Sequence, residues 1–371
     1  MKSKVKVAIV GLGFGKEFIP IYQQHPHCEV FAICQRNEKA LHENGDKFGI
    51  ARRFTKYEDL LTIAEIDAIH VVTPIFDHAS MSVAALKAGK HCACTVPMGT
   101  TLDECKAIVK AEWESQKVYM MMETAVYTRE FLYVKDLVKR GKLGRIQFAR
   151  GSHIQDMGLK GWPDYWKGFP PMWYGTHAIG PLLCITNTRA EAVVCHGSGS
   201  ISKELAQRYG SPFAVETATF RLKDANIVVE ATRSLYETVR QYRESFDIYG
   251  DKMAFEWEQL ADEGPALFEG GETVRRIQVP DTDTLLMKEI AKFTRREQID
   301  DPEHVSFIQG AGHGGSHPHL VQEFISAIVE GRPAAVNAVT SANWTCAGIC
   351  AHTSALKNGE RIFLPDFEGL S

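Results

Sequence analysis

The sequence predicts an α/β protein with an N-terminal, doubly wound parallel sheet and a C-terminal α/β domain with a large, open, mostly antiparallel sheet. Three observations carry this prediction. A glycine turn follows the first apolar run, apolar strands then alternate with helices, and after about residue 125 short strands separated by turns replace that alternation. Regular alternation is typical of a parallel sheet that is covered on both faces. We therefore expect two domains, over residues 1–124 and 125–371.

The N-terminal elements follow one another without interruption. Buried strands are expected at residues 4–10, 28–36, 66–74, 91–97 and 117–124, and helices at 16–26, 37–49, 78–90 and 100–116. The last of these helices has Thr101 as its N-cap and Glu104 three residues later, which is the pattern of a capping box. In the C-terminal half we expect strands at 145–155, 190–199, 216–222, 226–235, 244–258 and 272–280, and helices at 319–331 and 341–359.

Composition excludes several classes of protein. The net charge of -4 argues against nucleic acid or an anionic membrane as a partner. The first apolar run is too short to span a membrane. The nine cysteines are scattered, which favours a reduced, cytoplasmic protein. The spacing of Cys92 and Cys94 does not fit a zinc site. His313, His317 and His319 are expected to form a loop and a helix start, so no metal is predicted.

A glycine-rich turn lies between the first strand and the first helix. Gly11, Gly13 and Gly15, with Phe14 among them, let backbone N–H groups and the helix N-terminus approach a pyrophosphate. Lys16 stands where the complete fingerprint has glycine, so the motif is partial. Its strand–turn–helix context predicts a Rossmann dinucleotide-binding domain.

Other residues at the carboxyl ends of these strands complete the predicted cofactor site. Gln35 replaces the usual acid at the end of the second strand and can hydrogen-bond the ribose hydroxyls. Arg36 has no basic residue beside it, so we favour NAD over NADP. The carboxyl end of the third strand carries Thr73, Pro74 and His78. The alternative for His78 is a structural role, in which it only packs at the start of a helix.

These segments together resemble the glucose–fructose oxidoreductase and inositol dehydrogenase family (Gfo/Idh/MocA). The resemblance covers nearly the whole chain, from "VGLGFG" and "IDAIHVVTP" through "TVPMGTTLDEC", "RGKLGRI" and "DYWKG" to "PHLVQEF". It implies hydride transfer between NAD(P) and a carbon of a sugar or cyclitol. It also implies a second α/β domain whose open sheet makes oligomer contacts. We therefore expect a homo-oligomer, a dimer or a tetramer, that acts on a small carbohydrate.

The chain departs from the family pattern at two places. The family strand ends in Glu-Lys-Pro, and its lysine helps to move a proton. Here Thr95 and Val96 precede Pro97, which we assign to the cofactor site. The position of the family aspartate is occupied by Trp173, whereas His177 matches the family histidine.

The segment Tyr174-x-x-His177 is similar to the NAD-dependent glycosidase branches of the family. In those branches a tyrosine and a histidine replace the lysine and the aspartate. Trp166 and Lys167 match a pair that contacts the cofactor in relatives. Glu123 and Tyr127 follow the fifth strand, beside the expected nicotinamide. The predicted catalytic residues are therefore His177, Tyr174, Tyr127 and Glu123.

The chemistry needs groups of these types. Hydride transfer from a sugar carbon leaves an oxygen whose proton His177 can accept near neutral pH. A tyrosine, with an ordinary pKa of about 10, needs a positive charge nearby, for which Lys167 or the nicotinamide ring is a candidate. The resulting ketone acidifies the adjacent C–H, so that a group two carbons from the ketone can be expelled. Water addition and reduction then complete a hydrolysis without net oxidation.

Three functions stay open at this point. The first is redox-assisted glycoside hydrolysis, and the second is an ordinary sugar or cyclitol NAD(P)-dependent dehydrogenase. The third is a non-catalytic NAD-binding regulator. Lys160, Lys167, Arg233 and Arg240 leave room for an anionic sugar such as a sulfoquinovoside, although ordinary surface charge also accounts for them. Packing for Tyr174, and a structural carboxylate for Glu123, are the alternatives to catalytic roles.

Overall fold

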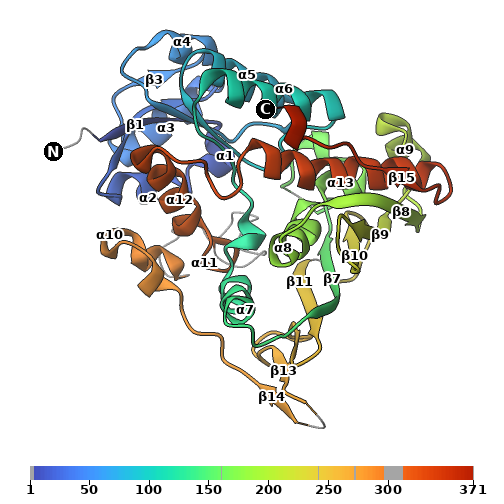
Figure 1. Cartoon of the computed structure of the whole chain (residues 1–371). Helices are drawn as coiled ribbons and strands as arrows, with labels where there is room; N and C mark the ends of the chain where they lie inside the picture. The colour runs from blue at the N-terminus through green and yellow to red at the C-terminus, as the bar shows by residue number, and fades with distance from the viewer. Residues whose placement is uncertain (1–3, 160, 241, 271–272, 296–311, 371) are drawn as a thin grey trace.

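The computed structural model describes residues 4–159, 161–240, 242–270, 273–295 and 312–370. Two sheets dominate it, one in the N-terminal third and one in the rest of the chain (Figure 1). The first sheet has six strands in the order β3-β2-β1-β4-β5-β6, and the pairings are parallel. Its strands are β1 Val5–Val10, β2 Cys28–Cys34, β3 Arg53–Phe54, β4 Ala68–Val71, β5 His91–Cys94 and β6 Tyr119–Met121.

Helices cover this parallel sheet, because its strands are apolar on both faces. They are α1 Leu12–Gly15, α2 Ile19–Gln24, α3 Glu38–Phe48, α4 Tyr57–Thr62, α5 Ile75–Lys87 and α6 Leu102–Ser115. The capping box at Thr101 and Glu104 is present at the start of α6, as predicted. The two-residue β3 was not predicted, since a strand this short leaves no hydrophobic period to detect.

The second sheet has nine strands in the order β14-β13-β12-β11-β7-β10-β9-β8-β15. Among the pairings of the described residues, β7 with β10 is parallel and the others are antiparallel, so the sheet is mostly antiparallel, as predicted. Its strands are β7 Ile146–Gln155, β8 Ala190–Ser198, β9 Val215–Leu222, β10 Val228–Ser234, β11 Tyr242–Gly250, β12 Ala254–Glu256, β13 Ala266–Phe268, β14 Val274–Arg276 and β15 Ile362–Phe363.

The helical segments that carry or adjoin the candidate site are η1 Thr124–Val126, α7 Arg129–Lys139, η2 Asp164–Trp166, η3 Pro171–Tyr174, α8 Thr176–Thr186 and α11 Gly312–Gly315. They include α7, α8 and α11, which Figure 1 labels. The remaining helices are α9 Lys203–Tyr209, η4 Asp283–Leu285, α10 Lys288–Ala291, η5 Lys292–Thr294, α12 His317–Glu330, α13 Ala338–Leu356 and η8 Glu368–Leu370.

The C-terminal segment returns to the first domain. Leu320 and Phe324 of α12 belong to the same buried apolar cluster as Val7 and Phe18. The N–H of Met121 in β6 donates to the carbonyl of Val336 at 3.0 Å. Residues after 311 therefore complete the packing of the nucleotide-binding domain, and the predicted division at residue 124 stays a prediction.

All nine cysteines are unpaired thiols, and all except Cys184 are buried. Within the described ranges, none of the helices combines the length and the apolar character that crossing a membrane requires. The oligomeric state and the cellular location stay predictions.

Candidate active site

Three polar side chains form a continuous hydrogen-bonded path between the domains. Nδ1 of His177 lies 2.6 Å from Oε1 of Glu123, and Nε2 lies 3.1 Å from the hydroxyl of Tyr174. Because the carboxylate accepts the Nδ1 proton, Nε2 of the neutral ring accepts the hydroxyl of Tyr174. Glu123 and His177 are buried, whereas Tyr174 is partly exposed. Tyr174 is therefore the end of the path that a ligand can reach.

Two glycines allow this close approach. A Cβ on Gly151 of β7 would lie 2.1 Å from the carbonyl oxygen of Ala178, so only glycine lets α8 lie this close to the sheet. A Cβ on Gly180 of α8 would lie 3.0 Å from Trp344 and 3.5 Å from Cγ of Glu123. Small residues at these positions thus bring the start of α8, which carries His177, against both Glu123 and β7.

The charged groups of the path shift one another's pKa values. Burial lowers the pKa of His177, but the carboxylates of Glu123 and Glu244 outweigh it, so the pKa is raised above its ordinary value. Burial raises the pKa of Glu123, but His177 outweighs it, and the pKa is lowered. Burial raises the pKa of Tyr174, and the nearby guanidinium of Arg233 opposes that rise. Glu123 therefore makes the neutral His177 ring a stronger base, and the protonated ring in turn stabilises the carboxylate.

Arg233 of β10 is the cation beside Tyr174. Its side chain is fully buried, its guanidinium lies 5.1 Å from the centre of the tyrosine ring, and Nε donates to the Tyr174 carbonyl at 2.8 Å. The other nitrogens donate to the carbonyls of His153 and Ser234 and to Oε1 of Gln155. Arg233 is thus a structural cation of the site and not part of an exposed basic surface.

The other basic residues that the sequence singled out lie elsewhere. Lys167 pairs with Asp164 at 2.9 Å on the surface, and Arg240 donates to the carbonyl of Gln259 at 2.7 Å. Lys160 lies outside the described residues. Arg233 is also bonded within the protein. The described residues of this group therefore do not favour binding of an anionic sugar at the site.

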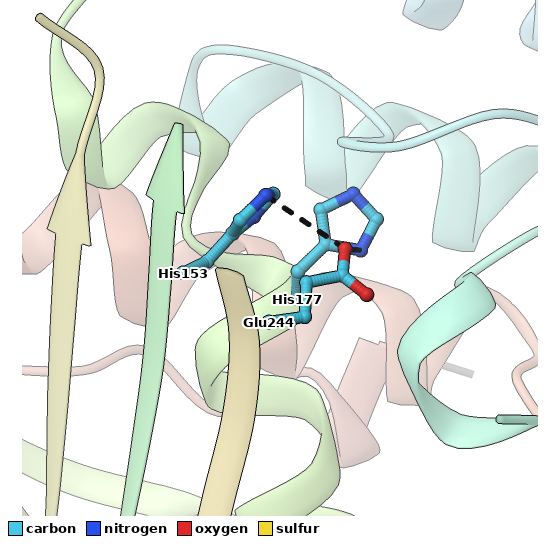
Figure 2. A group of neighbouring side chains, drawn as sticks. All are labelled: His153, His177 and Glu244. Carbon is cyan, nitrogen blue, oxygen red and sulfur yellow. Dashed lines mark ion pairs between the residues drawn. The ribbon is translucent and has the colours of Figure 1, made fainter. Parts of the chain in front are cut away.

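Two further side chains reach the site from the second sheet. His153 of β7 stands opposite Glu244 of β11 in the antiparallel pairing and beside Arg233 of β10 in the parallel pairing. Oε1 of Glu244 lies 3.7 Å from Nε2 of His153 and 3.5 Å from Nδ1 of His177. Figure 2 shows the three side chains converging from two strands and a helix. Sequence reasoning missed His153 and Glu244, because only strand register brings them together.

The histidines of the C-terminal segment also gather here. The ring of His313 stacks on His177 with centroids 6.3 Å apart, and its Nδ1 lies 3.2 Å from Nε2 of His317. Phe14 of the glycine turn packs edge-on against both rings. His319 lies apart and shares a hydrogen bond of 2.8 Å with Thr282. His317 begins α12, which agrees with the predicted helix start.

The remaining predicted site residues are placed differently. Tyr127 stacks on His319, with centroids 6.4 Å apart, and burial raises its pKa. Trp166 is buried, and its ring packs edge-on against that of Tyr174, with centroids 4.7 Å apart. This contact holds the tyrosine ring in place. Val96 is 8% exposed and belongs to the apolar core beside the sheet. The catalytic role of Tyr127 and the cofactor contacts of Trp166 and Lys167 stay predictions.

The glycine turn fits a dinucleotide. Gly11 has a φ of 89°, and a Cβ there would lie 2.2 Å from the carbonyl oxygen of Val72. A Cβ on Gly13 would meet no atom of the described residues within 4 Å, so open space lies against the turn. Gln35 accepts the N–H of Leu12 at 3.0 Å and thereby holds the turn in place. Its ribose contact, and that of the exposed Arg36, stay predictions.

His78 ties together two loops at the carboxyl edge of the sheet. Its Nδ1 lies 2.7 Å from the carbonyl of Pro97, and its Nε2 lies 2.9 Å from the carbonyl of Thr73. Burial lowers its pKa. With both nitrogens directed at backbone oxygens, His78 positions the loops that carry Thr73, Pro74 and Pro97, and its own cofactor contact stays a prediction.

Comparison with known proteins agrees with this geometry. Residues 5–123 match the family described as "Oxidoreductase family, NAD-binding Rossmann fold". The glycosyl hydrolase family 109 protein 1 of Phocaeicola vulgatus is 23% identical over 407 aligned residues, which cover 98% of this chain and 84% of that protein. A family 109 protein of Shewanella pealeana is 29% identical over 200 residues, covering 48% of this chain and 43% of that protein.

Solved structures show the same fold. Levoglucosan dehydrogenase, in a complex with NADH and levoglucosan, superposes with a TM-score of 0.81 at 19% identity, covering 98% of this chain and 100% of the other. The fold and the site define an NAD-dependent enzyme. Its N-terminal residues 5–123 match the model of the Gfo/Idh/MocA oxidoreductase family.

Proposed function

We propose that this enzyme hydrolyses a glycoside through transient oxidation of a sugar ring carbon. The observation that carries the proposal is the path Glu123–His177–Tyr174, which supplies an acid–base group in a site where Val96 offers none. The similarity to proteins named as glycosyl hydrolases of family 109 supports glycoside hydrolysis.

The residues of the path act in sequence. Bound NAD⁺ would supply the acceptor for a hydride from the ring carbon and later the source of its return. Tyr174 takes the hydroxyl proton of that carbon while its own proton passes to Nε2 of His177. The imidazolium is stabilised by Glu123, whose carboxylate lies 2.6 Å from Nδ1. The cation of Arg233 beside Tyr174 favours any negative charge that develops on the phenol oxygen.

Formation of the ketone allows the later steps of the hydrolysis to proceed. It acidifies the C–H on the next carbon, so the substituent one carbon further can leave as an alcohol. Water adds at the vacated carbon, and return of the hydride restores the hydroxyl. The sum of the steps consumes one water and leaves the cofactor unchanged.

A second candidate function is net oxidation of a small carbohydrate. The likeness to levoglucosan dehydrogenase favours it, and a single proton acceptor such as Tyr174–His177 is sufficient for it. In that case a stoichiometric amount of NADH accumulates and no glycosidic bond breaks.

One experiment separates the two functions. The protein is incubated with 4-nitrophenyl glycosides of both anomers, with and without added NAD⁺, and with the corresponding free sugars. We expect 4-nitrophenol release that depends on NAD⁺ and occurs without net NADH. Net NADH formation from free sugars, with no release of nitrophenol, would instead establish the dehydrogenase.

A further inference from the structure

His153 is a buried histidine whose ring is without a hydrogen-bond partner in the part of the chain that the structure describes. Its side chain is 2% exposed, and among the described residues neither ring nitrogen has a hydrogen-bond partner. Buried polar groups are nearly always hydrogen-bonded, because an unpaired one loses the bonds it had with water. His177, at 3%, is equally buried, and the two rings meet edge-on with centroids 4.9 Å apart. His153 is therefore an immediate neighbour of His177, and its ring centroid lies 6.2 Å from that of Tyr174, the partly exposed end of the path.

Glu244 stands beside His153 and, like it, has a side-chain atom that lacks a hydrogen-bond partner among the described residues. Among the described residues, its Oε1 has no hydrogen-bond partner, and its distance of 3.7 Å to Nε2 of His153 is slightly longer than a hydrogen bond. The side chain of Glu244 is 12% exposed, compared with 2% for His153. Strand pairing fixes the two residues opposite each other (Figure 2). A small shift on ligand binding is enough to close a carboxylate–imidazole pair like Glu123–His177.

A metal ion is the other use for such a cluster. One ligand atom from each of His153, His177 and Glu244 lies within 4.8 Å of the others. However, Nδ1 of His177 is already 2.6 Å from Oε1 of Glu123, and a nitrogen that carries a proton for a carboxylate has no lone pair for a metal. Burial also lowers the pKa of His153 well below its ordinary value, which favours the neutral ring, the form that can accept a proton.

We propose that His153 is a second proton-transferring residue of this site, with Glu244 as its positioning residue. The proposal rests on the hydrolysis proposed above and assigns one of its steps. Two proton acceptors are needed there, because the hydroxyl and the adjacent C–H belong to neighbouring carbons. Tyr174–His177 serves the hydroxyl, and His153 serves the C–H. A simple dehydrogenase has no use for the second acceptor.

Protons and electrons balance over the cycle. Once hydride removal has produced the ketone, Nε2 of His153 takes the proton of the adjacent carbon, and the C–H electron pair forms a C=C bond. The bond from the next carbon to the leaving oxygen breaks, and that oxygen takes its proton from Tyr174–His177. Water then adds its hydroxide to the vacated carbon and gives its proton to Tyr174–His177. His153 returns its proton to the adjacent carbon, the hydride removed at the start would return to the ketone carbon, and Tyr174–His177 gives its proton to the ketone oxygen.

The test compares the natural protein with the variants His153→Gln and Glu244→Gln in D₂O. The probes are the 4-nitrophenyl glycosides and free sugars used above, with NAD⁺ present. Three quantities are measured: the burst of NADH absorbance, deuterium incorporation at the carbon next to the oxidised one, and nitrophenol release. His352→Gln is the matched control, because His352 is also buried and pairs with Glu216 at 2.7 Å, but lies on α13 outside the site. Thermal unfolding and metal content are recorded for each protein.

We expect His153→Gln to keep the NADH burst and to lose deuterium incorporation and nitrophenol release by about 10²-fold or more, the scale of a lost general base. Glu244→Gln should show a smaller loss of the same kind, and His352→Gln should lose neither. If the natural protein incorporates deuterium and His153→Gln does so equally well, the inference fails while the proposed hydrolysis stands. If the natural protein forms NADH without any deuterium incorporation, both fail. A stoichiometric metal that is lost in His153→Gln would also overturn the inference, by making His153 a ligand.

Discussion

The carboxylate of Glu123 lies 2.6 Å from Nδ1 of His177, and both side chains are almost completely buried. Glu123 is the N-cap of η1, just after β6 of the parallel sheet, and His177 lies in the first turn of α8. A second hydrogen bond from Ala125 N–H, at 3.0 Å, fixes the carboxylate in place. Because a buried pair is favourable only when both partners remain, each residue determines the protonation of the other.

Replacing Glu123 by glutamine should shift the pH dependence of the reaction. Glu123 raises the pKa of His177, so its loss lowers that pKa, and His177 stays unprotonated to a lower pH. We therefore expect the acidic limb of the kcat/KM profile to move to lower pH, together with a lower maximum. An acidic limb that stays in place would assign the titration to another group.

The variant His177→Ala should lower turnover by about 10²-fold or more, the usual effect of removing a general acid or base. NAD affinity, measured by calorimetry, should change little, since the turn at Gly11 is untouched. His352→Ala is the matched control, because it also removes a histidine from a buried pair, with Glu216 at 2.7 Å. A similar loss of turnover in both folded variants would indicate a general packing effect and not proton transfer.

Replacing Arg233 by methionine should destabilise the fold. The change leaves buried acceptors of Tyr174, His153 and Gln155 without their donor. At about 1–3 kcal/mol for each unsatisfied group, we expect a loss of at least about 3 kcal/mol in the free energy of unfolding. Urea denaturation measures it, with Arg221→Met as a control, since Arg221 pairs with Glu191 on the exposed surface. Equal stabilities of the two variants would contradict the structural role of Arg233.

Restoring a lysine at Val96 should not restore a dehydrogenase. Val96 is 8% exposed in an apolar cluster, and an unpaired ammonium there costs several kcal/mol unless it loses its proton. We expect lower stability and loss of glycoside cleavage. NADH formation with free sugars and nitrophenol release are measured for both proteins. A variant that gains dehydrogenase activity and loses nothing would identify the natural site as a degraded dehydrogenase.

Two glycines of the turn should respond differently to alanine. At Gly13 the added methyl group enters open space where the pyrophosphate is expected, so NAD affinity should fall by about tenfold or more while stability is kept. At Gly11 the methyl group meets the backbone of Val72 at 2.2 Å, so the protein itself should lose stability. Calorimetry with NAD⁺ and thermal unfolding distinguish the effects. Unchanged affinity in Gly13→Ala would remove the turn from the cofactor site.

Much of the N-terminal domain could be predicted because its signals are local. The glycine turn, the alternation of strands and helices and the capping box at Thr101 each lie within a short stretch of sequence. The Tyr174-x-x-His177 spacing is also local, since the short step from the end of η3 to the first turn of α8 brings the hydroxyl 3.1 Å from Nε2. Glu123 was singled out for its place after a strand, but its 2.6 Å contact with His177 could not be read from the sequence.

By itself, the sequence determined the class of fold, the nucleotide turn and the absence of a lysine at Val96, because side-chain identity and local periodicity suffice for each. Only the tertiary structure decided that Arg233, His153 and Glu244 lie side by side on three strands, and that Lys167 stays on the surface. The physical reason is strand register. Residues 80 or more positions apart become neighbours through backbone pairing, and a shift of one residue would turn each side chain to the opposite face.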